Sequence, residues 1–87
     1  MRYVIPDSVL RATLDAEEVL LNTSTGQYHL LNRTGRLVVE RLQAGGTAEE
    51  AVSELVQTTG APVDDVQADV QSFLDALRAR GLLETVP

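Results

Sequence analysis

Few side chains in this 87-residue chain have the types and spacing that catalysis requires. His29 is the only histidine, and no cysteine, second histidine or cluster of carboxylates accompanies it to complete a metal site. A general base also needs a nucleophile, but the hydroxyls of residues 23–25 are typical of a turn. Asp64 and Asp65 resemble a catalytic pair, yet the dipole of a predicted helix explains their place in its first turn. We therefore expect no enzyme, and neither a metal nor a cofactor.

The charge and hydropathy of the chain exclude several classes of partner. Thirteen acidic residues against seven arginines give a net charge of −6. Nucleic-acid binding depends on neutralising phosphates, so an acidic chain disfavours it. No apolar run approaches the roughly 20 residues of a membrane span, and none forms a signal peptide. With no cysteine to form disulfides, we expect a cytoplasmic protein with no nucleic-acid and no membrane partner.

Three short strands are predicted in the N-terminal part of the chain. Residues 8–14, 18–22 and 27–31 carry the short apolar patterns typical of strands. Polar turns join them, and Gly26 in the second turn supplies the positive φ that a short hairpin loop needs. The strands should form an antiparallel meander, with the third strand returning beside the second.

Three helices should follow the strands. Asn32 can cap the first, Thr47 and Glu50 form a capping box that opens the second, and Pro62 stands at the start of the third. Glycines follow each helix and mark its end. The predicted helices cover residues 33–44, 47–59 and 62–80. Strands and helices together predict one α+β domain, residues 1–87, which is too small for a deep enclosed site.

The third predicted strand has an open edge, because the chain passes from it directly into a helix. An exposed edge is a hazard that proteins normally blunt, so its presence here favours a site that binds another chain as an added strand. Alternation places Tyr28 and Leu30 on one face of this strand and Gln27, His29 and Leu31 on the other. The sequence leaves open which face points inward.

Three segments carry a resemblance to a known family. The chain resembles the PqqD-like domains in its order of elements and in the segments GQYHLLNRTG at 26–35, GGTAEEAV at 45–52 and ADVQSFLDALRARGLL at 68–83. Within that family it is most similar to the free-standing B1 proteins of lasso peptide pathways, because TGQYHLLN has their compact hairpin. The resemblance implies a winged helix-turn-helix fold and a peptide recognition element for ribosomally made, modified peptides.

The resemblance also implies a ligand, a partner and a site. The ligand would be the leader segment of a precursor peptide, which adds as a strand to the third strand and lays side chains beside the third helix. The partner would be a separate leader peptidase of the B2 type, a transglutaminase-like cysteine protease, to which the bound leader is delivered. The residues implied to contact the leader are Gln27, Tyr28, His29, Leu30 and Leu31 of the strand and Val66, Asp69, Val70, Phe73 and Leu77 of the helix.

Each of these residues also has an ordinary structural interpretation. Phe73 shares its helical spacing with apolar neighbours, so it fits a core position as well as a groove lining. Asp69 could hold a leader amide or a basic side chain, but exposed acidic residues on helices are commonly just solvated. His29 is expected on the strand surface.

Two other functions fit the predicted fold. A winged-helix transcription regulator would place one helix in the major groove, but the third helix carries four aspartates before its first arginine, which opposes contact with phosphates. Alternatively, the open edge could pair with a second copy of the chain and make a dimerisation module.

Overall fold

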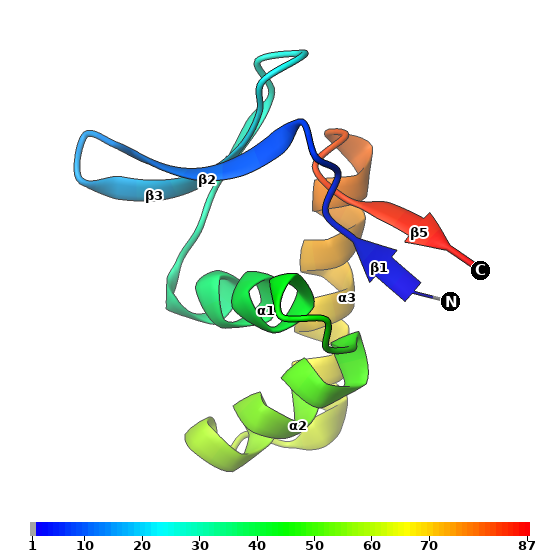
Figure 1. Cartoon of the computed structure of the whole chain (residues 1–87). Coiled ribbons are helices and arrows are strands. Elements are labelled where there is room, and N and C mark those ends of the chain that lie inside the picture. Colours follow the sequence, from blue (N-terminus) through cyan, green and yellow to red (C-terminus); the bar gives the residue numbers. More distant parts are fainter. Residues whose placement is uncertain (1) are drawn as a thin grey trace.

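Two antiparallel sheets and three helices make up the computed structural model of the chain, which describes residues 2–87 (Figure 1). The strands are β1 (Arg2–Val4), β2 (Val9–Leu14), β3 (Glu17–Asn22), β4 (Tyr28–Leu30) and β5 (Glu84–Val86). The helices are α1 (Arg33–Gln43), α2 (Ala48–Thr59) and α3 (Val63–Ala79). The predicted α+β class, with an antiparallel meander followed by three helices, is confirmed.

The larger sheet is the predicted meander, in the order β2-β3-β4. Asp15 and Ala16 form the first turn with positive φ angles of 50° and 67°, which suit a tight hairpin whose twist matches its strands. In the second turn Gly26 has φ 77°, and its amide donates to the carbonyl oxygen of Asn22 at 2.8 Å. Strand β3 begins at Glu17, one residue earlier than the predicted strand at 18–22.

The smaller sheet pairs the two ends of the chain. Tyr3 of β1 lies opposite Thr85 of β5 in an antiparallel register. Sequence patterns did not predict this sheet, because each strand has only three residues and shows no period. In Figure 1 the two strands lie beside the C-terminal end of α3.

The helix caps act as the sequence predicts. The Asn32 side chain accepts from the amide of Gly35 at 2.7 Å, and both hydrogen bonds of the Thr47–Glu50 capping box are present. The third helix is shorter by one residue at each end than expected, because Pro62 and Arg80 are its flanking caps. The first helix likewise ends at Gln43, with Ala44 as its cap.

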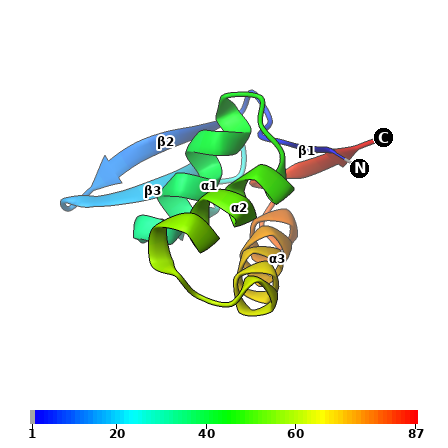
Figure 2. The same cartoon turned by 90° about the horizontal axis from the view of Figure 1, so that it is seen from below.

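The core lies between one face of the larger sheet and the helices. Its largest fully buried side chains include Leu20 of β3 and Leu74 and Leu77 of α3. Figure 2 shows the β2–β3 hairpin extending past the helices. Within residues 2–87, no helix is both long enough and apolar enough to cross a membrane.

Candidate functional site

Strand β4 is the edge of the larger sheet, and β3 is its only strand partner within the described residues. The hydrogen bonds that flank the strand show which way its backbone groups point. The Asn22 amide donates to the Gln27 carbonyl and the Leu31 amide donates to the Glu18 carbonyl. Because bonded and non-bonded pairs alternate in an antiparallel ladder, His29 also directs its amide and carbonyl toward β3.

Tyr28 and Leu30 therefore direct their backbone groups outward. Their pairs with β3 are the non-hydrogen-bonded ones, so two amides and two carbonyls lie on the open edge. An added strand needs such a row of donors and acceptors.

The two faces of β4 differ in burial, and this answers the question that the sequence left open. The Tyr28 and Leu30 side chains lie on the outer face and are 50% and 53% exposed. His29 is half-buried and Leu31 is buried, so these two face the helices. Gln27 precedes the strand and is exposed.

One side of α3 faces β4. Asp69, Phe73, Ala76 and Arg80 follow the three- and four-residue spacing that aligns side chains along one side of a helix. The Phe73 ring packs edge-on against His29, with ring centroids 5.6 Å apart and planes at 69°. Further along, Arg80 reaches β4 and its Nη1 donates to the Tyr28 carbonyl at 2.9 Å. We call these four residues of α3 the groove stripe.

Gly35 allows Phe73 to lie close to the start of α1. A Cβ at this position would be 3.2 Å from both Cε1 and Cζ of the Phe73 ring and 3.3 Å from Oδ1 of Asn32. Few Cβ atoms in proteins have contacts this short. The glycine therefore permits the ring to lie this close to α1, in the position where it contacts His29.

Asn22 connects the hairpin to α3. Its buried amide nitrogen donates to the Gly81 carbonyl at 3.0 Å, and its side-chain oxygen accepts from the amides of Ser24 and Thr25. These bonds hold the turn before β4 against the end of α3. Sequence reasoning missed Asn22, because its partner is 59 residues away in the chain.

A hollow of about 610 Å³ lies at the Tyr28 end of the open edge. Residues of the β3–β4 turn and of β4 line it together with Arg80: Thr25, Gly26, Gln27, Tyr28 and Leu30. Arg80 is the last residue of the helix predicted at 62–80, and it was not among the predicted contact residues. Its position, seven residues after Phe73, is the signal that would have placed it beside the strand.

His29 has an unusual environment for a histidine. Its Nδ1 atom is enclosed and has no hydrogen-bond partner among residues 2–87. Burial lowers the pKa of His29, and the positive charge of Arg80 lowers it further. The imidazole therefore favours its neutral form, which suits an apolar floor against Phe73. Within the described part of the chain, no three His, Cys, Asp or Glu residues cluster as metal ligands.

The structure divides the ten predicted contact residues into three groups. Val66, Val70 and Leu77 are buried in the core together with Leu31. His29 and Phe73 pack against each other, and Asp69 is exposed one turn from Phe73. The three others, Gln27, Tyr28 and Leu30, border the hollow near Arg80.

The outer face of the larger sheet is apolar over nearly its whole extent. Two cross-strand rows are Leu10, Leu21 and Tyr28, and Ala12, Val19 and Leu30. Leu14 extends the face toward the hairpin end, where Glu17 is its one charged member. Leu10 and Leu14 are 44% and 46% exposed, whereas Val19 is fully buried and yet lies outside the main core cluster. Contiguous exposed apolar surface of this kind marks interaction sites.

Comparison with known proteins gives a family match and two similar structures. Residues 17–83 match the family model described as coenzyme PQQ synthesis protein D (PqqD). The structure titled "TbiB1 in Complex with the TbiA(beta) Leader Peptide" has a TM-score of 0.84 and 33% identity, covering 97% of this chain and 98% of that one. "Lasso peptide synthetase B1 complexed with the leader peptide" has a TM-score of 0.85 and 24% identity, covering 98% and 100%. No curated protein matches significantly.

The matched region contains both β4 and α3. It begins at Glu17 and ends at Leu83, so it spans β3, β4 and the three helices. More than half of the chain is therefore matched, and the chain belongs to the PqqD family.

Proposed function

We propose that this chain binds the leader segment of a ribosomally synthesised precursor peptide, of the lasso class, without catalysing a reaction. The observation that carries the proposal is the open edge of β4 beside the groove stripe of α3. TbiB1, which is 33% identical, was solved in complex with a leader peptide. The leader would add to β4 as the next strand and direct alternate side chains over His29 and Phe73.

The expected free energies of binding require both the backbone edge of β4 and the buried contacts of leader side chains. Once Arg80 releases the Tyr28 carbonyl, the edge groups of Tyr28 and Leu30 offer four hydrogen bonds, each contributing about 0.5 to 1.5 kcal/mol net. Ordering a disordered peptide costs about 2 to 5 kcal/mol, which roughly cancels the backbone pairing. Affinity must therefore come from leader side chains buried in the groove, each contributing about 1.5 to 3 kcal/mol when fully buried.

A titration calorimetry experiment tests this proposal. The ligand is a synthetic leader from the precursor gene adjacent to the gene of this chain, and a scrambled peptide of the same composition is the control. We expect micromolar or tighter binding of the leader and none of the scrambled peptide. Equal heats for the two peptides would refute sequence-dependent leader binding.

We infer that the bound leader is delivered to a separate peptidase through the outer sheet face. This face is apolar, its members Leu10 and Leu14 are exposed, and it continues to Tyr28 and Leu30 at the open edge, so a partner seated on it would lie next to the added strand. Leu10→Asp should retain leader affinity but lose association with a B2-type, transglutaminase-like peptidase, measured with both purified proteins. Unchanged association would show that the peptidase binds a different surface of the chain.

Self-association is a second candidate function, favoured by the same exposed edge and face. Size-exclusion chromatography at several concentrations, with and without the leader, separates the two. A monomer that binds leader supports the adaptor, and a concentration-dependent dimer that the leader disrupts supports edge pairing between copies.

The winged helix-turn-helix description of the fold is part of this proposal, supported by three helices next to a β-hairpin. A DNA-binding role for it is disfavoured by charge. Asp64, Asp65, Asp69 and Asp75 are all exposed on α3, and the first arginine of that helix is Arg78.

A further inference from the structure

Arg80 is the one charged side chain that lines the hollow beside β4. It caps the C-terminal end of α3, is exposed, and donates from Nη1 to the Tyr28 carbonyl at 2.9 Å. That carbonyl is one of the four groups on the open edge. The guanidinium therefore occupies an acceptor that an added strand would use.

The charge of Arg80 is not neutralised within residues 2–87. Arg11 and Arg36 pair with Glu18, and Arg41 pairs with Glu54, but Arg80 forms no ion pair in this part of the chain. Its hollow contains no carboxylate either. A cation held in this way can accept a carboxylate without first breaking an internal ion pair.

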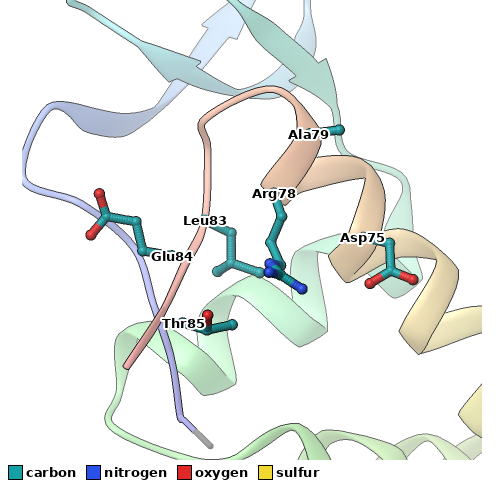
Figure 3. A pocket seen from close by; sticks show the side chains of 6 residues that line it. All are labelled: Asp75, Arg78, Ala79, Leu83, Glu84 and Thr85. Atoms are coloured by element: carbon teal, nitrogen blue, oxygen red, sulfur yellow. The ribbon is translucent and has the colours of Figure 1, made fainter. Parts of the chain in front are cut away.

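Arg78 provides the contrast, because it lies on the same helix only two residues earlier. Its side chain enters a different hollow, of about 660 Å³, between α3 and β5. Figure 3 shows Arg78 there together with Asp75 and Glu84, two acidic residues that line the same hollow. The two arginines therefore share their charge and lie close together in the chain, but they have different surroundings.

We propose that Arg80 is a specificity-determining residue that binds an Asp or Glu side chain of the incoming peptide, an inference that rests on the proposed function. When a peptide amide pairs with the Tyr28 carbonyl, the guanidinium is free to turn toward solvent and toward the peptide. Its planar fork of donors matches a carboxylate in a bidentate geometry. The acidic residue would lie close to the segment that pairs with Tyr28.

This assignment gives the groove a direction. Arg80 and Asp69 are the two ends of the groove stripe, about 16 Å apart at a rise of about 1.5 Å per helical residue. The net charge of −6 by itself favours a basic peptide. The local charge at the Arg80 end favours the opposite, so an acidic residue would fix which end of the peptide lies there.

Selection from a displayed library of random 12-residue peptides tests this inference. The baits are the wild-type chain, Arg80→Gln, Arg80→Glu and the matched control Arg78→Gln, each checked for folding by thermal melting. Wild-type and Arg78→Gln baits should enrich an acidic residue at one fixed spacing from the apolar anchors. Arg80→Gln should lose that enrichment, and Arg80→Glu should replace it with Lys or Arg.

Calorimetry on one selected peptide and its Glu→Gln (or Asp→Asn) variant measures the coupling between Arg80 and the acidic residue of the peptide. We expect the acid-to-amide change to weaken wild-type binding about tenfold and to leave Arg80→Gln binding unchanged. Acid enrichment that persists in Arg80→Gln, or that Arg78→Gln loses equally, overturns the role of Arg80 while leaving peptide binding intact. If the wild type selects apolar anchors without an acidic residue, this inference alone fails. If it enriches no peptide, the proposed function fails with it.

Discussion

One row of inward-facing side chains crosses the larger sheet, and the residues at its two ends, on the two edge strands, have different surroundings. Arg11 of β2, Leu20 of β3 and His29 of β4 lie side by side in register. At the β2 edge, Arg11 is held by Glu18 and Glu40, so charged groups lie beneath that edge. At the β4 edge, His29 packs against Phe73 and forms an apolar floor.

The two edges offer similar backbone groups and differ in the side chains around them, so an open edge alone does not define the binding site. By the same alternation, Arg11 and Thr13 direct their amides outward from β2, just as Tyr28 and Leu30 do from β4. Backbone pairing would be similar at both edges and reads no sequence. At β4 the edge lies next to the apolar contact of His29 with Phe73, and Arg80 lines the adjacent hollow without an ion pair among the described residues, whereas Arg11 at the β2 edge is paired with Glu18.

The largest expected effect comes from proline at the two edges. Leu30→Pro removes an edge donor and places a ring where the added strand must approach, so leader affinity should fall about 30-fold or more, roughly 2 kcal/mol. Thr13→Pro is the matched control on β2 and should leave affinity within twofold. Calorimetry gives both affinities and circular dichroism checks both folds. Equal losses of leader affinity in the two variants would show that the leader does not prefer the β4 edge over the β2 edge.

Proline at His29 is not an equivalent probe. Its amide faces β3, so His29→Pro should disrupt the ladder between β3 and β4 and lower the unfolding temperature. A variant with a normal melt would show that the register is different.

Truncation of Phe73 should have the next largest effect on leader affinity. Phe73→Ala should weaken leader binding about tenfold, because the apolar contact with the leader is lost, whereas Asp69→Ala should weaken it less than threefold, since an exposed charge contributes little. The Phe73 variant also loses packing against His29, so melts must be compared first. Calorimetry that ranks Asp69 above Phe73 would reverse the proposed source of affinity.

A smaller effect should follow from Gly35→Ala. Alanine improves helix propensity by up to about 1 kcal/mol, but its Cβ displaces the Phe73 ring. Because these two effects oppose each other, the unfolding free energy should stay within about 1 kcal/mol of the wild-type value, while leader affinity falls about threefold. Thr34→Ala, at the exposed neighbouring position, should change neither quantity. An unchanged affinity in Gly35→Ala would mean that the ring position is not critical.

The smallest effect should be a pH dependence from His29. Its pKa is lowered on folding, so between that value and the unfolded value of about 6.5 the unfolded state binds more protons. The free energy of unfolding should therefore decrease as pH falls through about 6.5 and level off below the folded pKa. His29→Gln should show a shallower decrease between pH 7.5 and 5.5 in denaturant titrations. Identical slopes would show that His29 titrates normally.

Local signals in the sequence predicted most of the fold. Turn and cap residues such as Gly26, Asn32 and the Thr47–Glu50 box act over a few positions, so their pattern is readable without coordinates. The β1–β5 sheet could not be predicted, because two three-residue strands at opposite ends of the chain meet only through tertiary packing.

The site was predictable as an edge but not as a groove. The alternation along β4 identified two faces, and the burial of these residues, together with the packing of His29 against Phe73, shows which face is inward. Val66, Val70 and Leu77 share helical spacing with Phe73, yet they are buried. Arg80 and Asn22 depend on contacts across 52 and 59 residues, which periodicity cannot reveal.

Amide hydrogen exchange by NMR is the sharpest test of strand addition at β4, because it reports on each edge residue separately. On addition of the leader, the amides of Tyr28 and Leu30 should exchange more slowly, while those of Arg11 and Thr13 keep their rates. Unchanged exchange at Tyr28 and Leu30 in a saturated complex, or slowing at Arg11 and Thr13 instead, would contradict strand addition at β4.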